Sequence, residues 1–229
     1  MPFYTRVVNR RLGRVFAAAA ATRRLSPNAV SVGSAVLWAA ALVVLCLVPT
    51  TLWSAVAVVA LLVLSFGLDA ADGQLARLTG RSGRAGEWLD HVLDAGRHVA
   101  VHLAVAVALY RFTDLSAATL LIPLGFATVS STRFVAQVLA EQLRPASATP
   151  SASPAASLAS SPAGSRGGAL LQLPADTGVL NASLLLLPAP TVFVVVYGLL
   201  ALANAGLLVA TMARRFTELS RLDRAAVRS

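Results

Sequence analysis

Long apolar runs dominate this sequence, and they restrict the folds open to it more than any other feature. The runs lie approximately at residues 29–49, 51–69, 92–112, 115–138 and 168–212. The last run is divided near Pro188 and Pro190, so it is long enough for two helices. A helix needs about 20 apolar residues to cross a bilayer, and lipid-exposed loops leave backbone polar groups without partners there. The pattern predicts an all-α integral membrane bundle of six transmembrane helices.

The composition agrees with a membrane protein and argues against nucleic acid as a partner. Of the 229 residues, 57% are hydrophobic and only 13% are charged, which is unusual for a soluble domain. The net charge of +9 comes from arginines that lie beside apolar runs, not on a soluble basic face. We therefore expect membrane lipids with anionic headgroups as partners, and no nucleic acid.

The arginines also predict the orientation of the chain in the membrane. Fourteen of the nineteen lie in three groups, namely Arg6, Arg10, Arg11, Arg14, Arg23 and Arg24, then Arg77, Arg81 and Arg84, then Arg214, Arg215, Arg221, Arg224 and Arg228. Cytoplasmic loops carry an excess of Lys and Arg. The pattern therefore predicts a multi-pass protein of the cell membrane, with both termini and the site described below on the cytoplasmic side.

The chain divides into five predicted segments. Residues 1–28 are expected to form an N-terminal amphipathic, interfacial helix, because Arg23 and Arg24 interrupt what could otherwise be a signal peptide. Pro174 and Asp176 fall inside the predicted fifth span, so the apolar pattern does not define where this span begins and ends. The remaining segments are spans one to four over 29–143, a disordered Ser/Ala/Pro linker over 144–168, spans five and six over 169–213, and a basic cytoplasmic tail over 214–229.

Acidic residues are scarce but concentrated. Five of the ten lie within 26 positions at the ends of predicted spans, namely Asp69, Asp72, Glu87, Asp90 and Asp94. Ionisable groups in or against hydrocarbon are costly, so such a cluster indicates a functional site. On helices, the spacings of three and four residues place each aspartate pair on one helix face.

Four converging carboxylates would repel one another unless cations lie between them. Oxygen ligands favour Mg²⁺, Mn²⁺ or Ca²⁺, and the chain has no set of Cys and His residues for a softer metal. Two such ions about 4 Å apart can bridge a diphosphate. The cluster therefore predicts a divalent metal site for phosphoryl transfer.

Small residues surround the aspartates, and two interpretations of them stay open. Gly73, Ala76 and Gly86 could allow the backbone to approach a nucleotide, or they could serve close helix packing. Arg77 could pair with a donor phosphate, although an arginine is also expected at a cytoplasmic helix end. Its position inside the cluster favours the functional interpretation.

Together these residues form the pattern D-x-x-D-G-x-x-A-R, eight further residues, then G-x-x-x-D-x-x-x-D, over 69–94. The pattern resembles, without a gap, the motif of the CDP-alcohol phosphotransferase (CDP-alcohol phosphatidyltransferase) family. The resemblance implies six transmembrane helices, an N-terminal interfacial helix and a homodimer. It also implies transfer of a phosphoalcohol from a CDP-alcohol or CDP-diacylglycerol donor to an alcohol acceptor in phospholipid biosynthesis, with release of CMP.

The resemblance also implies roles for the motif residues. Asp69, Asp72, Asp90 and Asp94 are expected to bind two divalent ions, Mg²⁺ or Mn²⁺, and Asp94 is expected to be the general base on the acceptor hydroxyl. The expected nucleotide-binding residues are Asp69, Gly73, Ala76, Arg77 and Gly86. Upstream, Pro27, Asn28 and Ser31 are similar to a Pro-Asn-x-x-Thr/Ser stretch often found in the family.

The acceptor alcohol is less well defined. Ala95 stands where inositol-phosphate and glycerophosphate enzymes of the family often have Arg or Lys, whereas the segment around Glu87 and His91 resembles choline and ethanolamine phosphotransferases. Arg133 could contact an acceptor phosphate or a lipid headgroup, or it could simply extend to the membrane surface. We therefore treat Glu87, His91 and Arg133 as candidate acceptor or supporting residues.

Two other functions are compatible with aspartates in a membrane. A membrane prenyltransferase also binds diphosphate through aspartates and magnesium, but such enzymes generally need more helices and two separated aspartate-rich motifs. A transporter or other cation-binding protein would be non-enzymatic, and the sequence contains no internal repeat that would support a transporter. The motif therefore favours the phosphotransferase.

Overall fold

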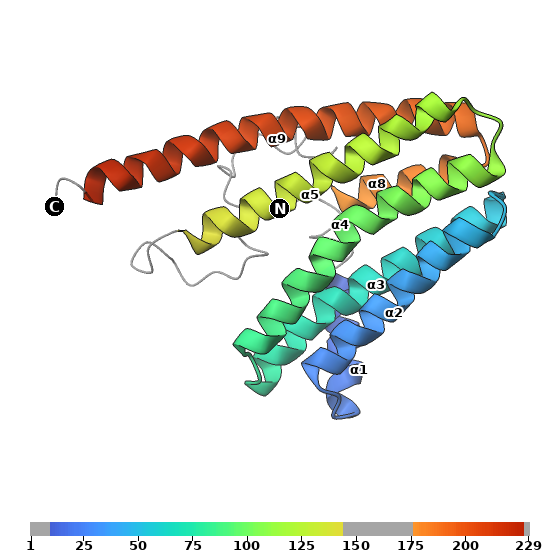
Figure 1. Cartoon of the computed structure of the whole chain (residues 1–229). Coiled ribbons are helices and arrows are strands. Elements are labelled where there is room, and N and C mark those ends of the chain that lie inside the picture. Colours follow the sequence, from blue (N-terminus) through green and yellow to red (C-terminus); the bar gives the residue numbers. More distant parts are fainter. Residues whose placement is uncertain (1–9, 144–175, 227–229) are drawn as a thin grey trace.

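A computed structural model of the chain describes residues 10–143 and 176–226, and every regular element in these two segments is helical (Figure 1). The elements are α1 (Arg10–Thr22), α2 (Pro27–Leu47), α3 (Leu52–Thr79), α4 (Arg84–Phe112), η2 (Ala117–Leu120), α5 (Leu121–Gln142), α8 (Thr177–Ser183), η5 (Leu184–Leu186) and α9 (Pro190–Ala226). Five stretches are long and apolar enough to cross a membrane, and α5 counts together with η2. The all-α membrane architecture is thereby confirmed.

The predicted count of six spans is not confirmed, and the span in question is the fifth along the chain. The apolar stretch Thr177–Leu186 is too short to cross a bilayer, and residues 169–175 of the predicted fifth span lie outside the described residues. The predicted linker over 144–168 lies there too. At the end of the chain, α9 continues to Ala226, so the described part of the predicted basic tail is helical.

The helices α3 and α4 extend beyond the apolar runs that predicted them. The run ends at residue 69 but α3 continues to Thr79, and α4 begins at Arg84, before the run that starts at residue 92. Gly80 ends α3 in a left-handed backbone conformation with φ of 65°, which residues with a Cβ rarely adopt. The complete motif therefore lies on two helices joined by a short turn.

The central arrangement around the motif depends on α2. This helix begins with Pro27 after the N-cap Ser26, whose hydroxyl accepts from the N–H of Ala29. It packs against both α3 and α4, whereas the backbones of α3 and α4 approach each other closely at few places. On the other side, α5 lies between α4 and α9 (Figure 1).

The short helix α1 packs closely on the motif-bearing part of α3. A Cβ on Gly13 would lie 3.0 Å from the Cβ of Ala70, and one on Gly67 would lie 2.8 Å from the ring of Phe16. Small residues therefore allow this close approach. Within the predicted segment 1–28, Arg10–Thr22 form the helix α1, and the interfacial position of this segment stays a prediction.

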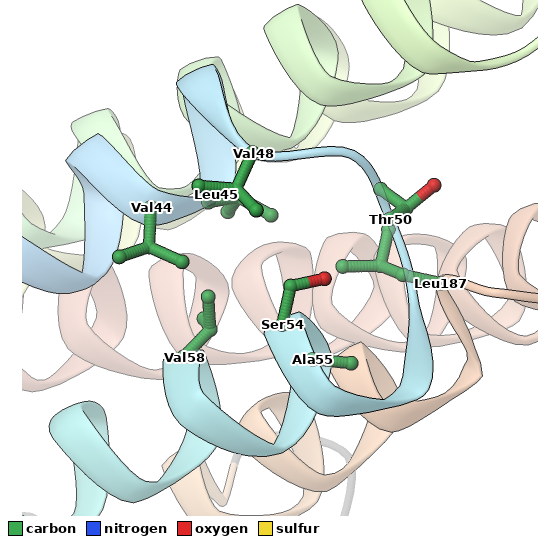
Figure 2. Close-up of a pocket in the computed structure, with 8 residues that line it drawn as sticks. All are labelled: Val44, Leu45, Val48, Thr50, Ser54, Ala55, Val58 and Leu187. Carbon is green, nitrogen blue, oxygen red and sulfur yellow. The ribbon is translucent and has the colours of Figure 1, made fainter.

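Away from the motif, the bundle has an aliphatic and aromatic core. Phe126 and Tyr197 pack there against His102, whose Nδ1 lies 2.5 Å from the Tyr197 hydroxyl, and Phe193 packs against Tyr197. A small hollow beside the α2–α3 connection is shown in Figure 2. Its lining contains no charged side chain and consists of Val44, Leu45, Val48, Thr50, Ser54, Ala55, Val58 and Leu187. It is therefore not a site for phosphate chemistry.

Candidate active site

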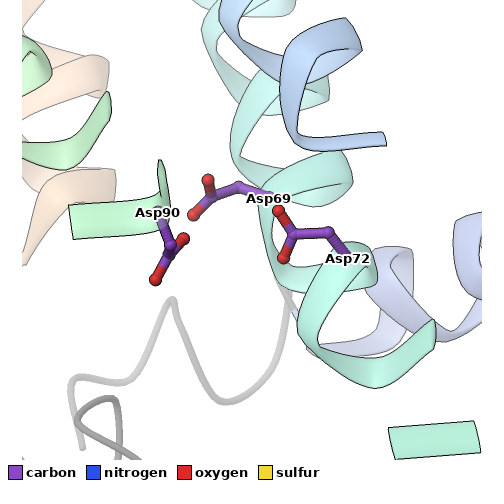
Figure 3. A group of neighbouring side chains, drawn as sticks. All are labelled: Asp69, Asp72 and Asp90. Carbon is purple, nitrogen blue, oxygen red and sulfur yellow. The ribbon is translucent and has the colours of Figure 1, made fainter. Parts of the chain in front are cut away.

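Three aspartates from two helices meet at one place. Asp69 and Asp72 come from α3 and Asp90 comes from α4, and their side chains point toward one another in Figure 3. One oxygen from each carboxylate lies within 4.8 Å of the others. Carboxylate oxygens gathered in this way form a donor set that suits a hard divalent cation.

Asp72 is the most buried of the three, with 8% of its surface exposed. The Ser31 hydroxyl on α2 donates a hydrogen bond to its Oδ2. One turn earlier on α2, the Asn28 side-chain oxygen would lie 3.4 Å from a Cβ on Gly86. The start of α2 therefore contacts both halves of the motif, and it orients the deepest carboxylate.

Asp94 lies apart from the group of three and has a different partner. Its Oδ1 accepts a hydrogen bond of 3.0 Å from Nη1 of Arg97, which lies one turn later on α4. The same nitrogen also forms an ion pair with Oδ1 of Asp69. The two aspartate pairs are therefore connected through Arg97, and three of the four predicted metal ligands come together directly.

The predicted nucleotide-binding residues lie next to the aspartates. A Cβ on Gly73 would meet only Nη1 of Arg77, at 3.6 Å, so this face of α3 is otherwise open among the described residues. The Arg77 side chain is exposed, and Ala76 is half-buried. An exposed guanidinium beside a bare backbone suits a phosphate group better than it suits helix packing. Gly86 differs from Gly73, because it faces Asn28.

The candidate acceptor residues lie along α4 and α5. Glu87 is exposed in the first turn of α4, and the half-buried His91 follows Asp90. The His91 ring meets Phe134 on α5 edge to face, with centroids 6.4 Å apart. Arg133 precedes Phe134 and is half-buried. His91 therefore lies at the α4–α5 contact, but the structure shows no direct bond between these three residues and the aspartates within its described residues.

Two polar residues at this site were missed by sequence reasoning. Arg97 is 5% exposed, and its Nη2 donates to the Ser34 hydroxyl on α2 over 2.7 Å. A signal for Arg97 existed, since it is an arginine inside an apolar run, three residues after Asp94. Ser34 had no such signal, because a lone serine in a membrane helix is common.

The site thus combines converging carboxylates, an exposed guanidinium and an open glycine face at one end of two helices. Such a group can bind divalent cations and a diphosphate, as enzymes of phosphoryl transfer must. The comparison with curated proteins found no match to the chain. The model of the family described as CDP-alcohol phosphatidyltransferase matches residues 24–217, which include the whole site. The chain therefore belongs to the CDP-alcohol phosphatidyltransferase family of multi-pass membrane enzymes, which transfer a phosphoalcohol group in lipid biosynthesis.

Proposed function

We propose that this protein transfers a phosphatidyl or similar phosphoalcohol group from a CDP-alcohol donor to an alcohol acceptor, releasing CMP, in a metal-dependent reaction. The observation that carries the proposal is the convergence of Asp69, Asp72 and Asp90 within 4.8 Å from two helices. The motif over 69–94 and the family match support the same reaction.

We assign two Mg²⁺ or Mn²⁺ ions to Asp69, Asp72, Asp90 and Asp94. The first three of these supply carboxylate oxygens within 4.8 Å of one another, and Asp94 would complete the set. Asp72 is oriented by Ser31, and the others have side chains that are partly exposed, so their oxygens are accessible to a ligand. When bound, such ions offset the negative charge of a diphosphate and of the leaving nucleotide. Among the residues that the structure describes, this group of possible ligands consists of aspartates, which suits a hard cation better than a soft one.

In the proposed reaction, Asp94 is the general base. The acceptor oxygen forms a bond to the phosphorus that carries the transferred alcohol, and the bond from that phosphorus to the oxygen of CMP breaks. The acceptor proton passes to Asp94. Because Oδ1 of Asp94 is bonded to Arg97, its Oδ2 is the oxygen available for this proton.

The cytidine diphosphate would lie against Gly73, Ala76, Arg77 and Gly86, beside Asp69. The open face at Gly73 and the exposed Arg77 guanidinium support this placement. Arg77 would pair with a phosphate oxygen of the donor.

The acceptor would lie toward α5, near Glu87, His91 and Arg133. The position of Arg133 on the helix packed against α4 supports this placement. Among the described residues Arg133 forms no ion pair, so its charge is available to an anionic acceptor or a lipid headgroup.

We further propose six crossings, a homodimer, and a cytoplasmic location for both termini and the site. The additional crossing, which is the fifth along the chain, would combine residues 169–175 with the helical stretch Thr177–Leu186. Arginine groups on either side of the spans support the orientation. The predicted segments at 1–28, 144–168 and 214–229 would then share the cytoplasmic side.

The proposal is tested by measuring CMP release from purified protein with a panel of donors and acceptors. CDP-diacylglycerol and water-soluble CDP-alcohols should each be paired with lipid and soluble alcohols, with Mg²⁺, Mn²⁺ or a chelator. We expect CMP from at least one pair, with loss of activity in the chelator. Asp69→Asn should lower release sharply, while substitution to Asn at Asp114, an exposed aspartate beyond the other end of α4, should not.

Two results would contradict the proposal. Folded protein that releases no CMP from any pair would exclude the transferase. Folded protein that binds Mn²⁺ but releases no CMP would instead favour a cation-binding protein, and release of diphosphate from a prenyl diphosphate would favour a prenyltransferase.

A further inference from the structure

Arg97 connects three helices through the two ends of its guanidinium. From α4, its Nη1 bonds to Oδ1 of Asp69 on α3 and to Oδ1 of Asp94 on its own helix. Its Nη2 donates to the Ser34 hydroxyl on α2. A planar guanidinium can make such contacts in fixed directions, which an ammonium cannot do.

Ser34 is itself fixed in orientation. Its hydroxyl donates to the backbone carbonyl of Ser65 over 2.8 Å, and Ser65 lies one turn before Asp69 on α3. The Ser65 hydroxyl donates in return to the Ser34 carbonyl. Since the Ser34 proton is used on α3, its oxygen is left to accept from Arg97. A continuous chain of hydrogen bonds therefore runs from the α2–α3 contact to both carboxylates.

Arg97 lies behind the carboxylates, not among the groups open to a substrate. Its side chain is 5% exposed, compared with 23% for Asp69 and 32% for Asp94. Its guanidinium lies over the Phe66 ring, 5.9 Å from the centroid, which favours a cation. Both contacts to carboxylates use Oδ1, so Oδ2 of Asp69 and of Asp94 is directed elsewhere.

The ion pair between Arg97 and Asp69 joins α4 to α3. Because the backbones of α3 and α4 approach each other at few places, the side chains of Arg97 and Asp69 provide a direct link between them. The link also places a positive charge in contact with the carboxylates of Asp69 and Asp94, which would otherwise repel each other.

We propose that Arg97 is a positioning residue for the transfer reaction. It sets the orientation of Asp94 toward the acceptor, holds Asp69 against α4, and partly balances the charge of the aspartates. This inference rests on the proposed function, in which Asp94 is the base and Asp69 binds metal. Ser34 assists by fixing the guanidinium.

The test compares Arg97→Met with the unchanged protein by two measurements. Mn²⁺ binding is followed by electron paramagnetic resonance on detergent-purified protein, with the metal alone as probe. CMP release gives kcat and the donor KM for a pair that the unchanged protein uses. We expect kcat to fall about 100-fold because the base is misplaced. Mn²⁺ should bind about tenfold more tightly, because a nearby positive charge is lost.

Opposite changes in kcat and Mn²⁺ affinity separate positioning from a merely structural role. A damaged fold would weaken Mn²⁺ binding together with turnover, and that parallel loss would overturn the proposal. Turnover that stays within about twofold of the unchanged protein would overturn it too, since misplacement of a base is expected to have a much larger effect.

Arg97→Lys separates charge from geometry. The charge is kept, so Mn²⁺ affinity should stay within about twofold of the unchanged protein. A single ammonium cannot reproduce the fork that joins Asp69, Asp94 and Ser34, so kcat should still fall about tenfold. Full turnover in Arg97→Lys would show that geometry is unimportant, against the proposal.

Two further variants complete the test. Arg111→Met removes an exposed arginine from the other end of α4 and should change neither measurement. Ser34→Ala keeps the charge but frees one end of the guanidinium, so kcat should fall about threefold with unchanged Mn²⁺ affinity. If Arg97→Met does not fold, normal turnover in both Arg97→Lys and Ser34→Ala would overturn the proposal.

Failure of the proposed function would give a different result. If the unchanged protein releases no CMP, the transferase proposal fails, and the Mn²⁺ measurements then decide the role of Arg97. Tighter binding in Arg97→Met than in Arg97→Lys would support a balancing charge beside the aspartates, and equal binding would overturn it.

Discussion

At the aspartate end of the bundle, around Asp69, Asp72, Asp90 and Asp94, polar side chains cross between helices. At the aromatic end, around His102, Phe126, Phe193 and Tyr197, aliphatic and aromatic side chains fill the interior. The aspartate end has buried contacts from Ser31 and Ser34 to charged partners, together with small residues under α1. The aromatic end has one buried polar contact among the core rings, between His102 and Tyr197.

The comparison shows how one bundle can serve two needs. In a membrane, close packing and a few hydrogen bonds hold helices together, and the aromatic end supplies both. Buried carboxylates oppose that stability, because charge is costly in hydrocarbon. The aspartates are therefore held by neighbouring polar groups while the aromatic end keeps the helices in place. Substitutions at the two ends should accordingly separate activity from stability.

The largest effect is expected for Asp72→Asn. The amide keeps the size of the side chain and can still accept from Ser31, but it removes a buried negative charge. CMP release should fall about 1,000-fold, because a metal ligand is lost. The free energy of unfolding should stay equal or rise, as measured by denaturation in mixed micelles. A clear loss of stability would mean that this carboxylate serves the fold.

Asp94→Asn should have the next largest effect. Its Oδ1 can still accept from Arg97, so the local geometry is kept while the base is removed. We expect kcat to fall about 100-fold with a nearly unchanged donor KM, as measured by CMP release. Near-normal turnover would show that another group takes the acceptor proton.

A smaller effect, on both stability and activity, is expected for Gly67→Leu. The new side chain would collide with the Phe16 ring and push α1 away from α3, two residues before Asp69. Unfolding should become easier by about 1 to 3 kcal/mol, and turnover should fall with it. Gly125→Leu is the matched control, because a Cβ there has open space around it among the described residues.

The smallest effect is expected for Tyr197→Phe at the aromatic end. Loss of the hydroxyl leaves Nδ1 of His102 without this partner but keeps the ring packing. The free energy of unfolding should fall by about 1 kcal/mol, and kcat should stay unchanged. A large loss of turnover would show that the two ends are coupled.

Much of the fold could be predicted from the sequence, because apolar length alone identifies membrane helices. The runs at 29–49 and 115–138 correspond closely to α2 and to η2 with α5. The ends of α3 and α4 could not be found this way. There the motif residues are polar, yet the backbone continues as helix, so the apolar run ends before the helix does. The short stretch Thr177–Leu186 was also too ambiguous for apolar length to define.

The site was predictable only in part. Spacing placed Asp69 and Asp72 on one face, and their approach to Asp90 is confirmed. The spacing of Asp90 and Asp94 placed both on one helix face, but it could not show that Arg97 takes up one oxygen of Asp94. The contact between Ser34 and Arg97 joins residues 63 positions apart, and such a pairing depends on helix packing that no local pattern records.

The left-handed Gly80 has a consequence for the spacing of the motif. Asp72 lies eight residues before it, and Asp90 lies seven residues after Gly83. At 1.5 Å per helical residue, the two aspartates are about 12 Å and about 10.5 Å from the turn, and so at nearly the same height. One inserted residue in either arm would rotate an aspartate by about 100° around its helix. The number of residues between Gly80 and each aspartate therefore matters more than the identity of most of those residues.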